Sequence, residues 1–327
     1  MPGGPPEHGF PPRFRAAPPR PLSSGPEWAP AGASAGTDAP AKINLFLRIL
    51  AREEGGFHCI ETVFCGISLA DRVEVTIGSE SGIRLEVTGS VETGPPSQNL
   101  AVRAAEVFLG RLGKDRPLLI RLRKRTPAGA GLGGGSSDAA AVLRLLDRLH
   151  PAALSREQLL EIAAELGSDV PFFLAESPLA LAWSRGERLL ELPSLPARPL
   201  LIVHPPEPLP TPEAYTAFSA RRGSYRPRPR IVFLSELAEW EGVAAAAHND
   251  FEEVAAERIP RVGEALRRLR RAGAIVALLS GSGSAVFGLF RSVEERDLAA
   301  AGFEKDELEP VSAETLEEWP TIETTSV

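Results

Sequence analysis

The chain has 327 residues, of which 24% are charged, and a formal net charge of −7. A chain of this length buries a sizeable core and commonly forms two domains. The negative net charge and the lack of a basic stripe interleaved with aromatic residues argue against a nucleic-acid partner. No apolar run approaches transmembrane length, which argues against a membrane partner. Cys59 and Cys65 fit neither a zinc site nor a secreted disulfide framework, so we expect a cytoplasmic protein.

The N-terminal half of the chain reads as a mixture of strands and helices. Residues 1–38 are rich in Pro, Gly, Ala and Ser and show no hydrophobic period, which predicts a disordered arm. The spacing of apolar residues after that arm predicts strands over 39–49, 60–69, 72–77, 82–87 and 117–125, helices over 100–112, 136–149 and 155–166, and a hairpin over 179–192.

A Pro-rich cluster, LPSLPARP at 192–199, marks the joint between two domains. After it we predict strands over 200–205, 275–279 and 285–290, and helices over 211–220, 231–241, 249–256 and 262–272. The acidic stretch from Ser292 predicts one more helix and then a fraying end. The pattern is α+β in both halves, which gives an N-terminal domain over 39–197, a C-terminal domain over 198–310 and a flexible acidic tail over 311–327.

The most informative segment is TPAGAGLGGGSSDAAA, residues 126–141, which has five glycines within Gly129–Gly135. A predicted strand precedes it and a predicted helix follows it. A glycine loop that enters a helix presents unpaired backbone N–H groups and the positive end of the helix dipole. This arrangement favours a phosphate-binding loop over a flexible linker.

The loop also contains a misleading pattern. Gly129, Gly131 and Gly134 fit G-x-G-x-x-G, the dinucleotide fingerprint, but a second helix follows where that fold needs a parallel strand ending in an acid. The P-loop pattern fails because no lysine follows the glycines. The set of motifs that marks protein kinases is missing as well. A third kind of phosphate-binding loop is therefore indicated.

Four segments in order carry a family resemblance: APAKINLFL at 39–47, the stretch 127–137, GSDVPFFL at 167–174 and LSGSGSAVFG at 279–288. They resemble the galactokinase–homoserine kinase–mevalonate kinase–phosphomevalonate kinase superfamily. Within it the chain is most similar to the kinases of 4-diphosphocytidyl-2-C-methyl-D-erythritol. The resemblance implies a two-domain α+β fold with an N-terminal domain like ribosomal protein S5 domain 2, a ferredoxin-like C-terminal domain and the active site between them.

The activity implied by this resemblance is ATP-dependent phosphorylation of the substrate's 2-hydroxyl, in non-mevalonate isoprenoid precursor biosynthesis. ATP and Mg²⁺ are the implied cofactors, and we assign no metal ligand. The implied partner is the small-molecule substrate, cytidine diphosphate-linked methylerythritol, and the chain is either a monomer or a homodimer. A homoserine or mevalonate kinase, or a non-catalytic nucleotide-binding relative, is the alternative.

Asp169 and Lys42 are the candidate catalytic residues. From the sequence alone, Asp169 reads more readily as the N-cap of a short helix that has Pro171 in its first turn. Lys42 alone reads as a solvated lysine on a strand. The resemblance instead implies that Asp169 is the catalytic aspartate and that Lys42 pairs with it and helps to polarise the substrate hydroxyl.

The candidate ATP-binding residues lie in and around the glycine loop. The loop backbone would bind phosphate, and the two serine hydroxyls are available to phosphate or Mg²⁺. Asn99 and Lys124 match positions that line the ATP pocket of the family, although Asn99 could equally cap the helix over 100–112. The loop residues concerned are Pro127, Gly129, Gly131, Gly133, Gly134, Gly135, Ser136 and Ser137.

The candidate substrate-binding residues are implied by the resemblance. The family's G-Y-H segment, which holds the cytosine ring, reads Gly-Phe57-His58 here, so stacking is retained and a hydroxyl is lost. Tyr215, four residues after Thr211, takes the second stacking position. A lone histidine such as His58 is otherwise most often a surface residue. Asn44 would contact the erythritol moiety or orient Lys42, and Gly281 belongs to a second glycine turn with Gly283.

Overall fold

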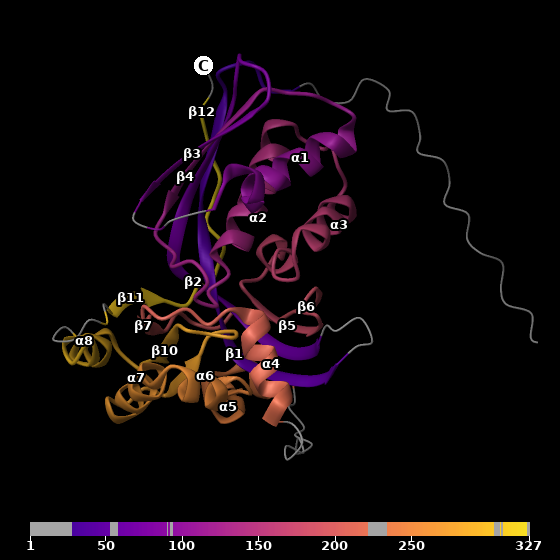
Figure 1. The fold of residues 1–327 in the computed structure, drawn as a ribbon. Helices are drawn as coiled ribbons and strands as arrows, with labels where there is room; N and C mark the ends of the chain where they lie inside the picture. The colour runs from indigo at the N-terminus through magenta and orange to yellow at the C-terminus, as the bar shows by residue number, and fades with distance from the viewer. Residues whose placement is uncertain are drawn as a thin grey trace, which may run out of the picture.

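The computed structural model describes residues 28–52, 58–89, 91, 94–221, 234–303, 308 and 310–325. In this part of the chain the strands form two sheets, with helices packed beside each (Figure 1). The larger sheet contains β1 (Ser34–Arg52), β2 (His58–Ile77), β3 (Ile83–Gly89), β4 (Leu118–Lys124), β5 (Leu179–Ser184), β6 (Arg188–Glu191), β8 (His248–Asn249) and β12 (Glu323–Thr325). The smaller sheet contains β7 (Pro199–Val203), β9 (Val276–Leu279), β10 (Val286–Leu289) and β11 (Pro310–Glu314).

Helices cover the two sheets separately (Figure 1). The strand orders are β12-β1-β2-β4-β3 in the larger sheet and β11-β7-β10-β9 in the smaller one. No helix in the described ranges is long and apolar enough to cross a membrane. The helices beside the larger sheet are α1 (Leu100–Leu112), α2 (Gly134–Leu149) and α3 (Arg156–Leu166), and those beside the smaller sheet are α4 (Thr211–Arg221), α5 (Trp240–Ala246), α6 (Glu252–Arg258), α7 (Pro260–Arg271) and α8 (Val293–Ala301).

The long antiparallel pair β1–β2 connects the two halves of the molecule. One face of the pair contributes Phe64 and Val73 to a core with α1, α2 and α3. The other face contributes Ile43 and Leu45 to a core shared with the smaller sheet. Strand β1 is therefore buried on both faces around Lys42, where a strand at a surface would expose alternate residues. The register between β1 and β2 shifts between Pro40 and Lys42 and again between Asn44 and Phe46, on either side of the segment that carries the polar residues Lys42 and Asn44.

The α+β fold in both halves is confirmed, and most predicted elements lie within a few residues of their predicted positions. Two predicted strands, 60–69 and 72–77, are one continuous strand, β2. The predicted gap between them contains Ala70 and Asp71. Asp71 is fully buried, yet its carboxylate accepts hydrogen bonds from the backbone N–H groups of Arg125 and Thr126 at 2.6 and 2.8 Å. The strand continues because this buried charge is satisfied.

The predicted helix over 231–241 is wrong where the structure describes it. A short 3₁₀ turn occupies Glu236–Ala238, and α5 begins only at Trp240. The chain folds back so tightly that a Cβ on Gly242 would lie 1.9 Å from the Glu236 carbonyl oxygen. The indole N–H of Trp240 donates to the Pro196 carbonyl at 2.8 Å, which anchors the start of the helix.

Both ends of the chain are more ordered than the sequence predicts. Residues 1–27 lie outside the described ranges, but Trp28 is buried and β1 starts at Ser34, within the expected arm. At the other end, β11 pairs with β7, and β12 pairs with β1 through the register Ser34–Thr325. Trp319, which lies between these two strands in the chain, packs against Phe172, and the centroids of the two rings are 5.4 Å apart. The segment expected to be a flexible tail instead contributes β11 to the smaller sheet and β12 to the larger sheet.

Candidate active site

A cavity of about 670 Å³ lies where the larger sheet meets the smaller one and α4. Its volume is in the range that small-molecule sites occupy. Phe57 is outside the described residues. Pro127, Gly129, Gly134, Gly135, Ser136, Ser137, Asn99 and Lys124 lie outside its lining. The predicted site residues that line it are Lys42, Asn44, His58, Gly131, Gly133, Asp169, Thr211, Tyr215 and Gly281.

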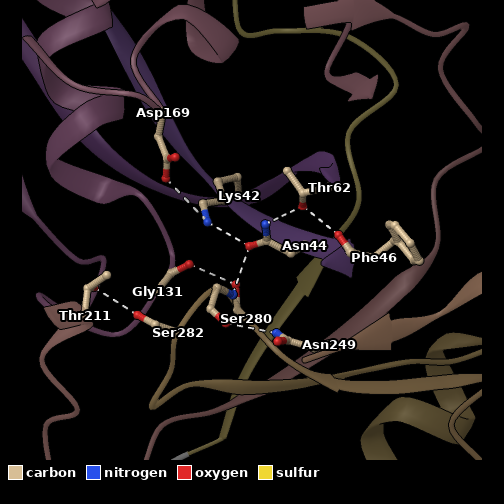
Figure 2. A network of polar contacts seen from close by, with 11 residues as sticks. Lys42, Asn44, Phe46, Thr62, Gly131, Asp169, Thr211, Asn249, Ser280 and Ser282 are labelled. Carbon is tan, nitrogen blue, oxygen red and sulfur yellow. Dashed lines mark hydrogen bonds and ion pairs between the residues drawn. The ribbon is translucent and has the colours of Figure 1, made fainter. Parts of the chain in front are cut away.

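The Lys42 ammonium lies at the centre of a polar network within this cavity (Figure 2). Its Nζ is 3.5 Å from Asp169 Oδ2 and donates a hydrogen bond to Asn44 Oδ1 at 2.8 Å. The lysine side chain is 4% exposed and that of Asp169 is 32% exposed. The ammonium is thus removed from bulk water and held by two oxygens, whereas the carboxylate remains open to the cavity.

The glycine loop and the second glycine turn both approach this ammonium. A Cβ on Gly133 would lie 3.0 Å from Lys42 Cγ, and a Cβ on Gly281 would lie 3.5 Å from Lys42 Nζ. Both glycines have positive φ, 71° and 55°. Glycine at these positions satisfies the backbone conformation and also admits the lysine between the two loops.

Asn44 fixes the geometry of the network from both sides. Its Oδ1 accepts from Lys42 Nζ and from the backbone N–H of Gly281 at 2.9 Å. Its Nδ2 donates to the Thr62 hydroxyl at 2.8 Å, and that hydroxyl donates to the Phe46 carbonyl at 2.6 Å. Every polar atom of the buried amide side chain therefore has a partner, so its orientation is determined.

The glycine loop leads directly into the start of α2. Gly133, in the left-handed conformation, is the N-cap of α2 and provides no side-chain cap. The first N–H groups of the helix are therefore left without a side-chain acceptor. Gly135 at this helix end is exposed and Ser136 is half-buried, whereas the buried Ser137 hydroxyl has no hydrogen-bond partner among the described residues. Such an end suits an anion.

The glycine loop is held against the second glycine turn by direct contacts. The Ser280 hydroxyl donates to the Gly131 carbonyl at 3.0 Å, and the Ala285 N–H donates to the Ala130 carbonyl at 3.1 Å. A Cβ on Gly131 would lie only 2.1 Å from the Ser280 carbonyl oxygen. The two loops therefore pack backbone against backbone at Gly131.

Gly131→Ala is expected to raise the KM for ATP and lower the free energy of unfolding, because the added methyl forces the two loops apart. Gly129→Ala is the matched control, since Gly129 also has positive φ (67°) but a Cβ there meets nothing within 4 Å. The Gly129→Ala control should lower the free energy of unfolding only by the backbone strain of a non-glycine residue at positive φ, about 1–2 kcal/mol. Denaturant unfolding and ATP kinetics of both variants measure the difference. Equal effects of the two substitutions would contradict the close packing at Gly131.

Lys124 lies beneath the loop, in a buried ionic cluster. Its ammonium donates to Asp71 Oδ2 and, at 2.7 Å, to Asp138 Oδ2. Burial lowers the pKa of Lys124, but the Asp138 and Asp71 carboxylates outweigh it and raise the pKa above its ordinary value. Burial also raises the pKa of Asp138 to about 7, against the attraction of Lys124. The cluster joins the end of β4 and the start of α2, the two stems of the loop, to β2.

Asn99 is the N-cap of α1, which is one of the two roles that the sequence allowed, the other being a contact in the ATP pocket. Its Oδ1 accepts from the Ala101 N–H at 2.9 Å. The start of α1 nevertheless lies close to the loop, because a Cβ on Gly135 would lie 3.9 Å from Leu100 Cδ1. Asn99 thus lies near the start of α2 but does not line the cavity that contains Lys42.

The other end of the cavity is aromatic. The His58 ring stacks on the Tyr215 ring with centroids 4.5 Å apart and planes 16° from parallel, and Phe251 meets Tyr215 edge-on at 4.9 Å. Burial, together with the charge of Asp169, raises the pKa of Tyr215 to about 12. The Thr211 and Ser282 hydroxyls are hydrogen-bonded at 2.9 Å. The structure therefore brings His58, Thr211 and Tyr215 into the same cavity as the Lys42–Asp169 pair.

Known proteins match most of this chain. The family model described as GHMP kinases N terminal domain matches residues 99–177, and the GHMP kinases C terminal model matches residues 233–307. The 4-diphosphocytidyl-2-C-methyl-D-erythritol kinase of Solibacter usitatus is 42% identical over 257 residues, which cover 77% of this chain and 80% of that protein. The kinase of the same name from Methylacidiphilum infernorum is 41% identical over 79% of this chain and 87% of its own.

The chain belongs to the 4-diphosphocytidyl-2-C-methyl-D-erythritol kinase family, within the GHMP kinases. A crystal structure of a 4-(cytidine 5'-diphospho)-2C-methyl-D-erythritol kinase superposes with a TM-score of 0.72 at 36% identity, covering 86% of this chain and 98% of that one. Homoserine kinase from Cytophaga hutchinsonii superposes with a TM-score of 0.67 at 18% identity, which shows a shared fold. The predicted two-domain GHMP kinase fold is confirmed, and membership makes the chain an ATP-dependent small-molecule kinase.

Sequence reasoning missed several residues that position this GHMP kinase site. Asn249 donates to the carbonyls of Leu279 and Gly281 at 2.7 and 2.9 Å and so holds the second glycine turn. The sequence predicted it only as the first residue of the helix over 249–256. Asp71 was passed over as a break between strands, although a lone acid inside an apolar strand was an available signal. Among the described residues, no group of three His, Cys, Asp or Glu side chains is arranged to hold a metal ion.

Proposed function

We propose that this chain transfers the γ-phosphoryl group of ATP to the 2-hydroxyl of 4-diphosphocytidyl-2-C-methyl-D-erythritol, a step of non-mevalonate isoprenoid precursor biosynthesis. The relatives that carry this kinase's name support the substrate. The observation that carries the proposal is one cavity with the Lys42–Asp169 pair beside the glycine loop and the His58–Tyr215 stack at its other end. A small acid or alcohol would need no aromatic surface of this kind.

Asp169 accepts the proton of the 2-hydroxyl as the oxygen attacks the γ-phosphorus. Its carboxylate faces the cavity and is open enough to meet a substrate hydroxyl. The Lys42 ammonium, fixed by Asn44, attracts the negative charge that develops on the transferred group. The loop Gly131–Ser137 and the start of α2 bind the ATP phosphates.

Kinases of this kind use Mg²⁺ to neutralise the charge on the ATP phosphates, and the residues present fit that requirement. Mg²⁺ takes oxygen ligands, commonly one or two from the protein together with substrate phosphates and water. The buried Ser137 hydroxyl, which has no partner among the described residues, and the neighbouring Ser136 hydroxyl are two protein oxygens at the loop that could serve as such ligands.

At the aromatic end, Tyr215 and His58 hold the cytosine, by stacking and by hydrogen bonds to the ring nitrogens of the histidine. We further propose a cytoplasmic enzyme that works as a monomer or a homodimer and has no nucleic-acid or membrane partner. The buried thiol of Cys65, which is not in a disulfide, supports a reducing compartment.

An ADP-release assay with three acceptors in parallel tests this proposal. We expect ADP release with 4-diphosphocytidyl-2-C-methyl-D-erythritol and none above background with homoserine or mevalonate. Turnover with homoserine alone would overturn the substrate assignment. Absence of ATP turnover with all three acceptors would instead favour a nucleotide-binding protein without kinase activity.

A further inference from the structure

Strand β3 forms an open edge of the larger sheet. Its seven residues, Ile83–Gly89, pair in parallel with β4 on one side, and no strand of the described ranges pairs with the other side. The backbone N–H and C=O groups along an unpaired side are a template for another strand. Proteins commonly block such an edge with Pro, with Lys or with a bulge. Strand β3 contains neither Pro nor Lys, and its register with β4 runs without a shift.

The margin of the sheet beside this edge is apolar and incompletely covered. Ile83 and Leu85 are half-buried, and Val87 is 37% exposed. These three side chains lie on one face of the strand, because residues two apart point the same way. On that face Ile83 and Leu85 pack at the border of the core, as does the half-buried Val107 of α1. An open edge flanked by partly exposed apolar side chains favours a partner that adds a strand to the sheet.

The sequence of β3 is self-complementary in one antiparallel register. When Leu85 lies opposite Leu85 of a second copy, Ile83 lies opposite the partner's Val87. In the same register Arg84 lies opposite the partner's Glu86, and two-fold symmetry makes this contact twice. A register centred on Arg84 or on Glu86 would instead place two like charges opposite each other, which destabilises strand pairing. The charges therefore select the register centred on Leu85.

The charged side chains of this register are accessible to a partner. The Arg84 side chain is 68% exposed and that of Glu86 is 39% exposed. Within one chain the two form an ion pair at 3.2 Å, so they lie on the same face of β3. Arg121, the strand partner of Glu86 on β4, also contacts the Glu86 carboxylate at 3.2 Å. A second copy thus meets charges of both signs on this face, in the order that its own β3 complements.

We propose that two copies of this chain form a homodimer by antiparallel pairing of their β3 strands, centred on Leu85. The two larger sheets then become one continuous sheet. Stable interfaces bury about 1,200–2,000 Å² in total, so the apolar margin of β3 and α1 is part of the contact. No β3 residue lines the cavity that contains Lys42, so the dimer leaves both active sites open. The inference decides between the monomer and the homodimer named above and does not depend on the identity of the acceptor.

Two charge reversals and their mixture test this interface. Glu86→Arg places Arg84 opposite an arginine of the partner, and Arg84→Glu places Glu86 opposite a glutamate. Each variant alone should raise the dimer dissociation constant about 10-fold or more, because two repulsive contacts replace two attractive ones. An equimolar mixture of the two variants should form a heterodimer, since opposite charges then face each other again. Sedimentation velocity over a range of concentrations measures both effects, with the wild type expected as a dimer of 34.9 kDa chains.

Glu74→Arg is the matched control. Glu74 is 40% exposed and contacts Arg121 at 3.1 Å, so its reversal removes the same kind of contact as Glu86→Arg. It lies on β2, which is paired on both sides inside the sheet. This control should keep the dimer. All of these variants should retain the wild-type kcat, because none of the substituted residues lines the cavity.

Several results would overturn the proposed dimer. One is a wild-type enzyme that remains monomeric throughout the concentration range. Others are a dimer that Glu86→Arg leaves intact, a dimer that Glu74→Arg disrupts to the same extent, and single variants that do not associate when mixed. Sedimentation does not involve the acceptor. A dimer with the expected charge dependence but no kinase activity would therefore remove only the proposed function.

Discussion

Asp169→Asn should lower kcat by about 10²–10⁴-fold, the usual contribution of a positioned general base. The amide keeps the shape of the carboxylate but cannot accept the proton of the substrate hydroxyl. The KM values for ATP and for the acceptor should change little, because the lost interaction belongs to the transition state. Steady-state kinetics with both substrates varied measures this split.

Asp115→Asn is the control for this experiment, because Asp115 is exposed and lies outside the cavity lining. Asp169 is partly exposed, so its substitution should leave the melting temperature close to that of the wild type. Near-normal turnover by a folded Asp169→Asn enzyme would remove Asp169 from the reaction. Its role would then be structural, although it is not the cap that the sequence suggested, because the short helix Pro171–Leu174 has Val170 as its N-cap and no side-chain cap.

Lys42→Met should lower kcat by roughly 10²–10³-fold, the range found when one preorganised electrostatic contact is removed. Methionine retains most of the apolar stem, which packs beside Gly133, and removes the ammonium that pairs with Asp169. Asn44 keeps its hydrogen bond from the Gly281 N–H, so the two glycine loops should stay in place. The loss should therefore appear in kcat more than in stability.

Lys114→Met is the matched control, since Lys114 is an exposed lysine remote from the cavity lining. Circular dichroism and thermal unfolding establish whether the Lys42→Met enzyme is folded. If it is folded and retains kcat within a factor of two of the control, the buried ammonium has no role in phosphoryl transfer.

Local sequence signals predicted the helices with clear ends. Helix α1 has the predicted bounds because Asn99 caps its start and Gly113, in the left-handed conformation, ends it. Strands β11 and β12 were missed because they are short, polar and stabilised by partners elsewhere in the chain, such as the pairing of Ser34 with Thr325. Pairing between such distant segments leaves little trace in local periodicity.

The same difference applies to the site. The glycine loop can be predicted from the seven residues Gly129–Gly135 alone, and the family resemblance implied that Lys42 pairs with Asp169. The contacts that hold these residues are made by Asn249, Asp71 and the loop–turn packing at Gly131, which join segments far apart in sequence. No periodicity reveals such contacts, because each one depends on the final packing of both sheets.

The position of the new phosphate tests the proposed phosphoryl transfer most directly. The wild-type enzyme is incubated with ATP and 4-diphosphocytidyl-2-C-methyl-D-erythritol, and the products are analysed by ³¹P and ¹³C NMR. A single new phosphomonoester coupled to C2, formed together with an equal amount of ADP, is the predicted result. Phosphate on another hydroxyl, or ADP and inorganic phosphate without a phosphorylated acceptor, would contradict the assignment of the Lys42–Asp169 pair to the 2-hydroxyl.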